Sequence, residues 1–178
     1  MYAQLGRFCE AATPLETYIS YDFVKRKDPQ LDRLISEYRS KGNCKQSKIT
    51  ANAQARIRNS GSVLLVDATL NNVVGTFIFD TGASLVSIKK SFADKARISS
   101  NIEDKVTLQT ANGLADGLLA TASSVQVGNA YSTFVPVVIV DDAKLGTEEG
   151  VSGLLGMSFL SRYDVKFGKD SVELRNRF

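Results

Sequence analysis

The sequence contains no histidine and only two cysteines, Cys9 and Cys44. Without histidine, the chain cannot form a Ser-His-Asp triad, a Cys-His dyad or a zinc site with a histidine ligand. Two cysteines far apart in the sequence provide neither a Cys-x-x-Cys motif nor the four thiolates of an all-cysteine zinc site. Carboxylates are therefore the leading candidates for any catalytic role.

Long apolar runs are also missing. The longest ones, around residues 63–66 and 134–140, have the length of strands, whereas a membrane-spanning helix needs about 18 or more apolar residues. No basic segment followed by an apolar run opens the chain, so we expect it to be soluble as it stands and to lack a signal peptide. A signal or membrane tether upstream of Met1 stays open, and with it an exported or periplasmic location. There Cys9 and Cys44 could pair, and the sequence leaves that pairing undecided.

The charge differs between the two ends of the chain. Residues 1–60 carry eleven Lys and Arg against six Asp and Glu, whereas residues 61–178 carry eleven against thirteen. The segment Asn59-Ser60-Gly61-Ser62 is typical of a boundary. We predict a basic, partly helical N-terminal extension over 1–60 and a catalytic domain over 61–178. The extension is interpreted as a prosegment or tether; docking on the domain, contact with anionic lipid and simple solvation are the alternatives.

Helix signals lie mainly in the extension. Asp28 followed by Pro29 predicts a helix start, and Gly42 predicts its end. Lys45–Arg58 has a weak apolar stripe and is predicted as helix or linker. Two short helices are expected later, over 89–96 and 157–162.

Strand signals dominate the second region. Asn71-Asn72 predicts the turn of a first hairpin, and a turn containing Gly168 predicts a terminal hairpin. The predicted strands cover residues 63–70, 73–79, 106–110, 118–127, 134–140, 165–167 and 172–174.

One motif carries the chemistry. The apolar run Phe77-Ile78-Phe79 leads into Asp80-Thr81-Gly82 and then Ala83-Ser84, and the apolar pair of Leu154-Leu155-Gly156 follows much later. An aspartate carried by a buried strand into a tight turn sits where burial and a neighbouring charge can suit it to acid–base chemistry. An ordinary strand followed by a turn is the alternative. The combined context favours a catalytic loop.

These segments, with Thr110-Ala111-Asn112-Gly113, resemble the retropepsin-like aspartic proteases, particularly their bacterial single-domain members, over roughly residues 60–178. The resemblance implies a mostly β, closed barrel-like lobe with short helices. It implies that Asp80 is the catalytic residue, that Thr81 anchors the loop across a two-fold axis, and that Gly82 and Ala83 support the turn.

The resemblance also assigns two neighbouring loops. A flap with Ala111, Asn112, Gly113 and Leu114 would close over substrate, although an ordinary surface hairpin is the alternative reading. The leucines of Leu154-Leu155-Gly156 would pack behind the Asp80 loop, with Gly156 allowing close approach.

The motif occurs once, whereas amide hydrolysis by carboxylates needs two of them. We therefore expect an aspartic endopeptidase that acts on polypeptides as a homodimer, with one Asp80 from each copy and with no metal and no organic cofactor. Asp141-Asp142 is the nearest acidic rival, and we expect it in a solvated loop. The alternative function is a noncatalytic peptide-binding or dimerisation module. Nucleic-acid binding is not expected, because aromatic residues do not alternate with the basic ones.

Overall fold

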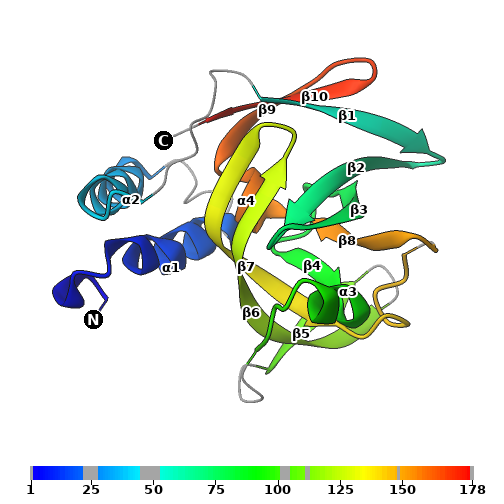
Figure 1. The fold of residues 1–178 in the computed structure, drawn as a ribbon, viewed down its shortest axis with the longest axis horizontal. Coiled ribbons are helices and arrows are strands. Elements are labelled where there is room, and N and C mark those ends of the chain that lie inside the picture. The colour runs from blue at the N-terminus through cyan, green and yellow to red at the C-terminus, as the bar shows by residue number, and fades with distance from the viewer. Residues whose placement is uncertain are drawn as a thin grey trace.

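The protein is described from a computed structural model that covers residues 2–21, 28–44, 53–100, 105–110, 113–147 and 149–176. The helical elements lie mostly near the N-terminus (Figure 1), and they are η1 (Ala3–Leu5), α1 (Phe8–Tyr21), α2 (Pro29–Lys41), α3 (Lys90–Lys95) and α4 (Met157–Leu160). The strands are β1 (Ala53–Ser60), β2 (Val63–Leu70), β3 (Val73–Phe79), β4 (Val86–Lys89), β5 (Lys105–Thr110), β6 (Gly113–Val127), β7 (Ala130–Val140), β8 (Val151–Leu155), β9 (Tyr163–Phe167) and β10 (Ser171–Asn176).

Within the described residues, ten strands form one sheet in the order β5-β6-β7-β4-β8-β3-β2-β1-β10-β9. An additional pairing joins β6 to β2, at Thr69 with Gln126 and Leu70 with Val125. This pairing closes the strands between β6 and β2 into a ring, with β9, β10 and β1 extending from it (Figure 1). The predicted fold class, a mostly β, closed barrel-like lobe with short helices, is confirmed.

The main hydrophobic core combines residues of the ring strands with residues of β1, β10, α3 and α4. Phe77 on β3 is fully buried and meets Phe92 of α3 edge-to-face at 5.4 Å between ring centroids. Apolar residues of β2, β4, β6 and β7 surround this pair. Because strand side chains alternate between the two faces, burying one face of each strand leaves the other free to line a surface or cleft.

Several sequence predictions agree with the observed elements. Asp28 caps α2, and its carboxylate accepts hydrogen bonds from the amides of Gln30 and Leu31. The predicted and observed bounds of β2 and β3 are the same. Their turn has left-handed φ values of 46° at Asn71 and 69° at Asn72, a conformation that asparagine tolerates better than most residues.

The prediction of helix or linker over Lys45–Arg58 is wrong for the part that the structure describes. Residues from Ala53 onward form β1, which pairs with β2 and β10. Along β1, buried residues alternate with exposed ones, and the buried ones are Ala53, Ala55 and Ile57. The strand therefore buries one narrow face. The sequence did not reveal this strand because small alanines give a weak strand signal and because its partner β10 lies at the other end of the sequence. The predicted boundary at Asn59–Ser62 covers the end of β1 and the tight turn that leads into β2.

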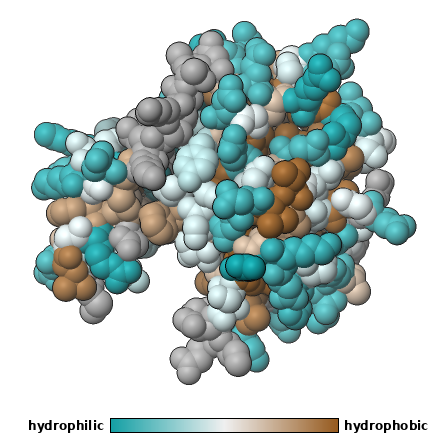
Figure 2. All heavy atoms as spheres, viewed as in Figure 1, coloured by the Kyte–Doolittle hydropathy of each residue, from teal (hydrophilic) through white to brown (hydrophobic). Residues whose placement is uncertain are grey.

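The helices α1 and α2 form a pair at one side of the sheet (Figure 1). A disulfide joins Cys9 of α1 to Cys44 just after α2, which decides the pairing that the sequence left open. Figure 2 shows hydrophobic side chains on the visible side of this pair. Elsewhere in the N-terminal segment, Tyr2, Leu5 and Tyr18 are exposed. Over the described residues, no helix has both the length and the apolar character needed to cross a membrane.

A buried ion cluster attaches the helical pair to the sheet. Glu16 of α1 is 2% exposed and contacts two arginines, Arg39 of α2 and Arg162 just after α4. The Arg39 Nε donates to Glu16 at 2.6 Å, and Arg162 approaches the other carboxylate oxygen at 2.6 Å. Arg162 also donates to the carbonyl oxygens of Thr133 and Phe134 on β7. The cluster thus links both helices of the pair to β7 and to the residues that follow α4.

Candidate active site

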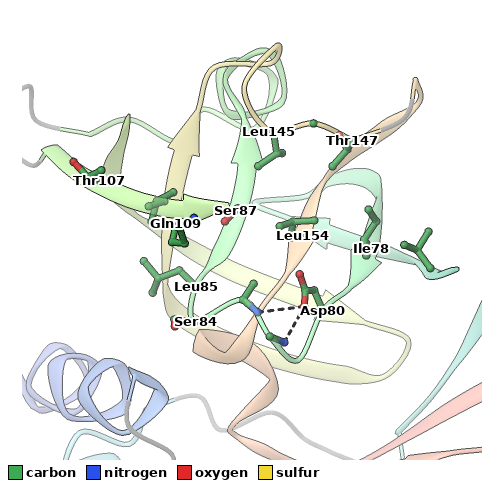
Figure 3. A pocket seen from close by; sticks show the side chains of 15 residues that line it. Ile78, Asp80, Ser84, Leu85, Ser87, Thr107, Gln109, Leu145, Thr147 and Leu154 are labelled. Carbon is green, nitrogen blue, oxygen red and sulfur yellow. Dashed lines mark hydrogen bonds between the residues drawn. The ribbon is translucent and has the colours of Figure 1, made fainter. Parts of the chain in front are cut away.

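Asp80 lies at the end of β3, in the turn that follows Phe79. Its backbone amide donates to the carbonyl oxygen of Leu155 at 3.1 Å. Its Oδ1 accepts hydrogen bonds from the amides of Gly82 at 2.8 Å and Ala83 at 3.2 Å (Figure 3). The turn therefore holds one carboxylate oxygen, and Oδ2 has no bond to any residue that the structure describes.

The parallel pairing of β3 with β8 brings the two predicted segments together. Ile78 lies opposite Leu154, and Phe79 lies opposite Leu155. Because parallel strands end at the same edge of a sheet, Asp80 and Gly156 follow their strands side by side. Beyond Gly156, the amides of Met157 and Ser158 donate to the carbonyl oxygens of Ala83 and Ser84 at 2.8 and 3.0 Å.

Gly156 has no room for a side chain. A Cβ at this position would lie 2.1 Å from the carbonyl oxygen of Leu85 and 2.8 Å from that of Ala83. Both contacts are with backbone, which cannot rotate away. The Asp80 loop can rest on the start of α4 only because residue 156 is glycine.

Ser158 is a supporting residue that the sequence analysis did not identify. It is 1% exposed, its hydroxyl accepts from the Val86 amide at 2.9 Å, and it donates to the Pro136 carbonyl at 2.7 Å. It thereby joins the start of β4 to β7 beneath the loop. One polar residue within the otherwise apolar run Met157–Leu160 was the available signal.

Asp80 faces a cleft of about 710 Å³ (Figure 3). Asp80 is the only ionisable side chain among the described residues that line it. The others are mostly apolar or hydroxyl-bearing residues, namely Val63, Ile78, Gly82, Ala83, Ser84, Leu85, Ser87, Thr107, Leu108, Gln109, Leu145, Gly146, Thr147 and Leu154.

The β5–β6 hairpin contributes Thr107, Leu108 and Gln109 to the cleft. Of the predicted flap residues, Ala111 and Asn112 lie outside the described residues. Gly113 has φ 105° and pairs with Thr110 at the start of β6, and Leu114 is 73% exposed. Neither of these two lines the cleft, so their contact with substrate remains a prediction.

The acidic pair Asp141-Asp142 lies elsewhere. Asp142 accepts from the backbone amide of Ser91 at 3.0 Å and from its hydroxyl, at the start of α3. Both bonds hold the pKa of Asp142 below its usual range, and the bond from the Ser91 hydroxyl contributes most. Asp141 lines a separate cavity of about 240 Å³. No group of three or more potential metal ligands occurs in the part of the chain that the structure describes.

Comparison with known proteins agrees with this geometry. A family model described as "gag-polyprotein putative aspartyl protease" matches residues 66–162, more than half of the chain. The chain belongs to the retropepsin-like aspartic proteases. The matched segment of this retropepsin-like protein includes the Asp80 loop, the β5–β6 hairpin and Gly156.

A solved structure is also similar to this retropepsin-like protein. It is described as a retropepsin-like aspartic protease from Rickettsia conorii, with 27% identity and a TM-score of 0.51. The similarity covers 69% of this chain and 98% of that one. Among curated proteins, no sequence matches.

Proposed function

We propose that this protein is an aspartic endopeptidase, active as a homodimer in which the Asp80 carboxylates of two copies activate one water molecule. The observation that carries this proposal is the position of Asp80, the only ionisable side chain among the described residues lining the cleft. A single carboxylate cannot both accept a proton from water and donate one to the peptide. A second copy would supply the other carboxylate, and the two would share a proton.

The proposed reaction follows from that shared proton. The ionised carboxylate takes a proton from water as the water oxygen attacks the peptide carbonyl carbon, while the protonated one donates to the carbonyl oxygen. As the tetrahedral intermediate collapses and the C–N bond breaks, the leaving nitrogen gains the proton that was taken from water, and the other carboxylate takes back the proton from the former carbonyl oxygen. The amides of Gly82 and Ala83 hold Asp80 Oδ1 in place during these steps, which avoids reorganisation of the loop.

The loop also supports the proposed two-fold arrangement. Thr81 and Gly82 are exposed at the turn beside Asp80. We expect the Thr81 of each copy to contact the opposite loop and to bring the two carboxylates together. A closed dimer places the same patch of each subunit against its partner, so exposed loop residues are suited to meet on the axis.

Noncatalytic peptide binding is the alternative, and the mostly apolar cleft would suit it equally. Asp80 is half-buried and has no described cation partner, and burying such a charge costs free energy. A module that only binds peptides has no need of this carboxylate, so its presence favours catalysis.

The deciding experiment is casein cleavage by the wild type and by Asp80→Asn over about pH 3–8, the range in which paired carboxylates can titrate. We expect cleavage by the wild type and loss of at least about a thousandfold in rate for Asp80→Asn, because a carboxamide cannot accept the proton from water. Asp141→Asn is the matched control and should retain activity. Cleavage by Asp80→Asn at the wild-type rate would overturn the proposal.

Mixing the two proteins tests the dimer. If only dimers with two Asp80 carboxylates act and the subunits exchange freely, an equimolar mixture of wild type and Asp80→Asn should keep about half of the activity per wild-type chain. Unchanged activity per wild-type chain would show that one copy is sufficient.

A further inference from the structure

The cleft contains a buried serine whose hydroxyl has no partner among the residues that the structure describes. Ser87 on β4 is 7% exposed and lines the cleft. Its hydroxyl makes no hydrogen bond to any residue that the structure describes. In contrast, the equally buried Ser132 bonds the hydroxyl of Tyr163 at 2.7 Å, and Ser158 bonds two backbone groups.

The direction of the Ser87 side chain follows from strand alternation. Its neighbours Val86 and Ile88 are fully buried in the main core. Ser87 therefore points to the opposite face of β4, which is the cleft side (Figure 3). The Ser87 hydroxyl is not one of the fully enclosed unpaired atoms of the described residues, so it opens onto the cleft, where a ligand group can take the place of water.

The surroundings of Ser87 define what can bind there. Leu154 lies opposite Ser87 in the β4–β8 pairing, and Leu85, Leu108 and Leu145 line the same cleft. No described lysine or arginine lines it. A ligand group at this position should thus combine an apolar part with one neutral hydrogen-bonding group.

The sheet register places Ser87 near the reacting centre. Ile78 pairs with Leu154, and Leu154 pairs with Ser87, so the three lie across neighbouring strands. Two strand spacings amount to roughly 10 Å. Side chains on one face of an extended peptide repeat about every 7 Å. Since Asp80 follows Ile78 by two residues, Ser87 lies about three peptide residues, at roughly 3.4 Å each, from a bond held at Asp80.

We propose that Ser87 is a specificity-determining residue that hydrogen-bonds a threonine side chain of an extended peptide, within about three residues of the bond to be cleaved. The threonine methyl group would pack on the leucines while its hydroxyl bonds that of Ser87. This inference rests on the proposed function, in that the cleft is taken as the peptide site.

The test measures binding separately from cleavage. The probes are octapeptides in which one position at a time is threonine or its isostere valine, titrated into Asp80→Asn by calorimetry. At one position we expect threonine to bind about three- to tenfold more tightly than valine, the effect of one neutral hydrogen bond. Ser87→Ala in the same background should remove this preference while valine peptides still bind, which also shows that the variant is folded.

Two further variants sharpen the result. Ser132→Ala removes an equally buried hydroxyl outside the cleft and should leave the threonine preference unchanged. Ser87→Cys keeps nearly the same shape with a weaker hydrogen-bonding group and should give an intermediate preference.

The outcomes separate this inference from the proposed function. A threonine preference that requires Ser87 supports the inference even if the wild type cleaves nothing, in which case only the peptidase proposal fails. Cleavage by the wild type without a threonine preference, a preference that survives Ser87→Ala, or binding of none of the peptides would overturn the role of Ser87.

Discussion

Two acidic side chains, Glu16 and Asp80, lie in contrasting surroundings. Glu16 is 2% exposed and contacts Arg39 and Arg162. Asp80 is half-buried beside an open cleft, and its described partners are the two amides of its own turn. Burial lowers the pKa of Arg162 below its usual range, and the neighbouring Glu16 opposes that shift. A carboxylate committed to two cations fixes structure, whereas one held only by amides is available to a substrate.

The short helix α4 connects the two regions. At its start, Met157 and Ser158 donate to the chain just after the Asp80 turn. Shortly after its end, Arg162 contacts Glu16. Variants on either side of α4 therefore ask whether the helical pair only stabilises the protein or also positions the Asp80 loop.

The largest effect is expected from Glu16→Gln, which leaves Arg162 buried without its carboxylate partner. We expect the free energy of unfolding to fall by about 3–5 kcal/mol, as for other broken buried ion pairs. Urea denaturation measures this change. Glu37→Gln breaks an exposed pair with Lys41 and should change the free energy of unfolding far less, because solvent screens an exposed pair. Equal losses in the two variants would contradict the contrast between buried and exposed carboxylates.

Removing the disulfide should have the next largest effect. Cys9→Ser with Cys44→Ser opens a loop with a sequence separation of 35 residues, and we expect a loss of about 2–4 kcal/mol in unfolding free energy. The wild type with a reductant should match the double variant in thermal denaturation, whereas the double variant itself should not respond to reductant. If the folded double variant keeps full activity, the helical pair stabilises the protein but does not position the Asp80 loop.

Gly156→Ala tests the catalytic side of the comparison. The added Cβ meets the carbonyl oxygen of Leu85, and we expect about 1–3 kcal/mol of destabilisation. Because the displaced backbone includes Ala83, which bonds Asp80, kcat should fall further than the folded fraction alone explains. Gly168→Ala, whose nearest contact is the movable Ser171 hydroxyl at 3.0 Å, is the control. Full activity of folded Gly156→Ala would contradict tight packing of the loop.

The smallest effect is expected for Asp142, on the loss of stability at acidic pH. The Ser91 hydroxyl and amide lower the pKa of Asp142 in the folded protein. Ionised Asp142 therefore stabilises the folded protein at pH values above the ordinary pKa of a carboxyl group. That contribution is lost as the pH falls through the lowered pKa. We expect Asp142→Asn to reduce the decline in stability on acidification, by less than about 1 kcal/mol because the site is exposed. Loss of casein cleavage in this variant would instead make Asp142 a catalytic candidate.

Local sequence signals predicted the elements that depend on neighbouring residues. Asp28 begins a helix because its carboxylate accepts from amides of the next turn, and Asn71-Asn72 turns a hairpin between adjacent strands. The strand β1 was missed because its alanines carry little signal and its partner β10 is distant in sequence. Likewise β4, four residues long, is a strand only because β7 and β8 flank it.

By itself, the sequence determined the family and the β-rich lobe and made Asp80 the predicted catalytic residue, because these depend on a contiguous motif and on local strand and turn patterns. The tertiary structure alone decided the Cys9–Cys44 bond, the burial of Glu16 between two arginines, and the cleft that contains both Asp80 and Ser87. Each of these depends on residues that are distant in the chain, and only the packing of the sheet and helices brings them within contact distance.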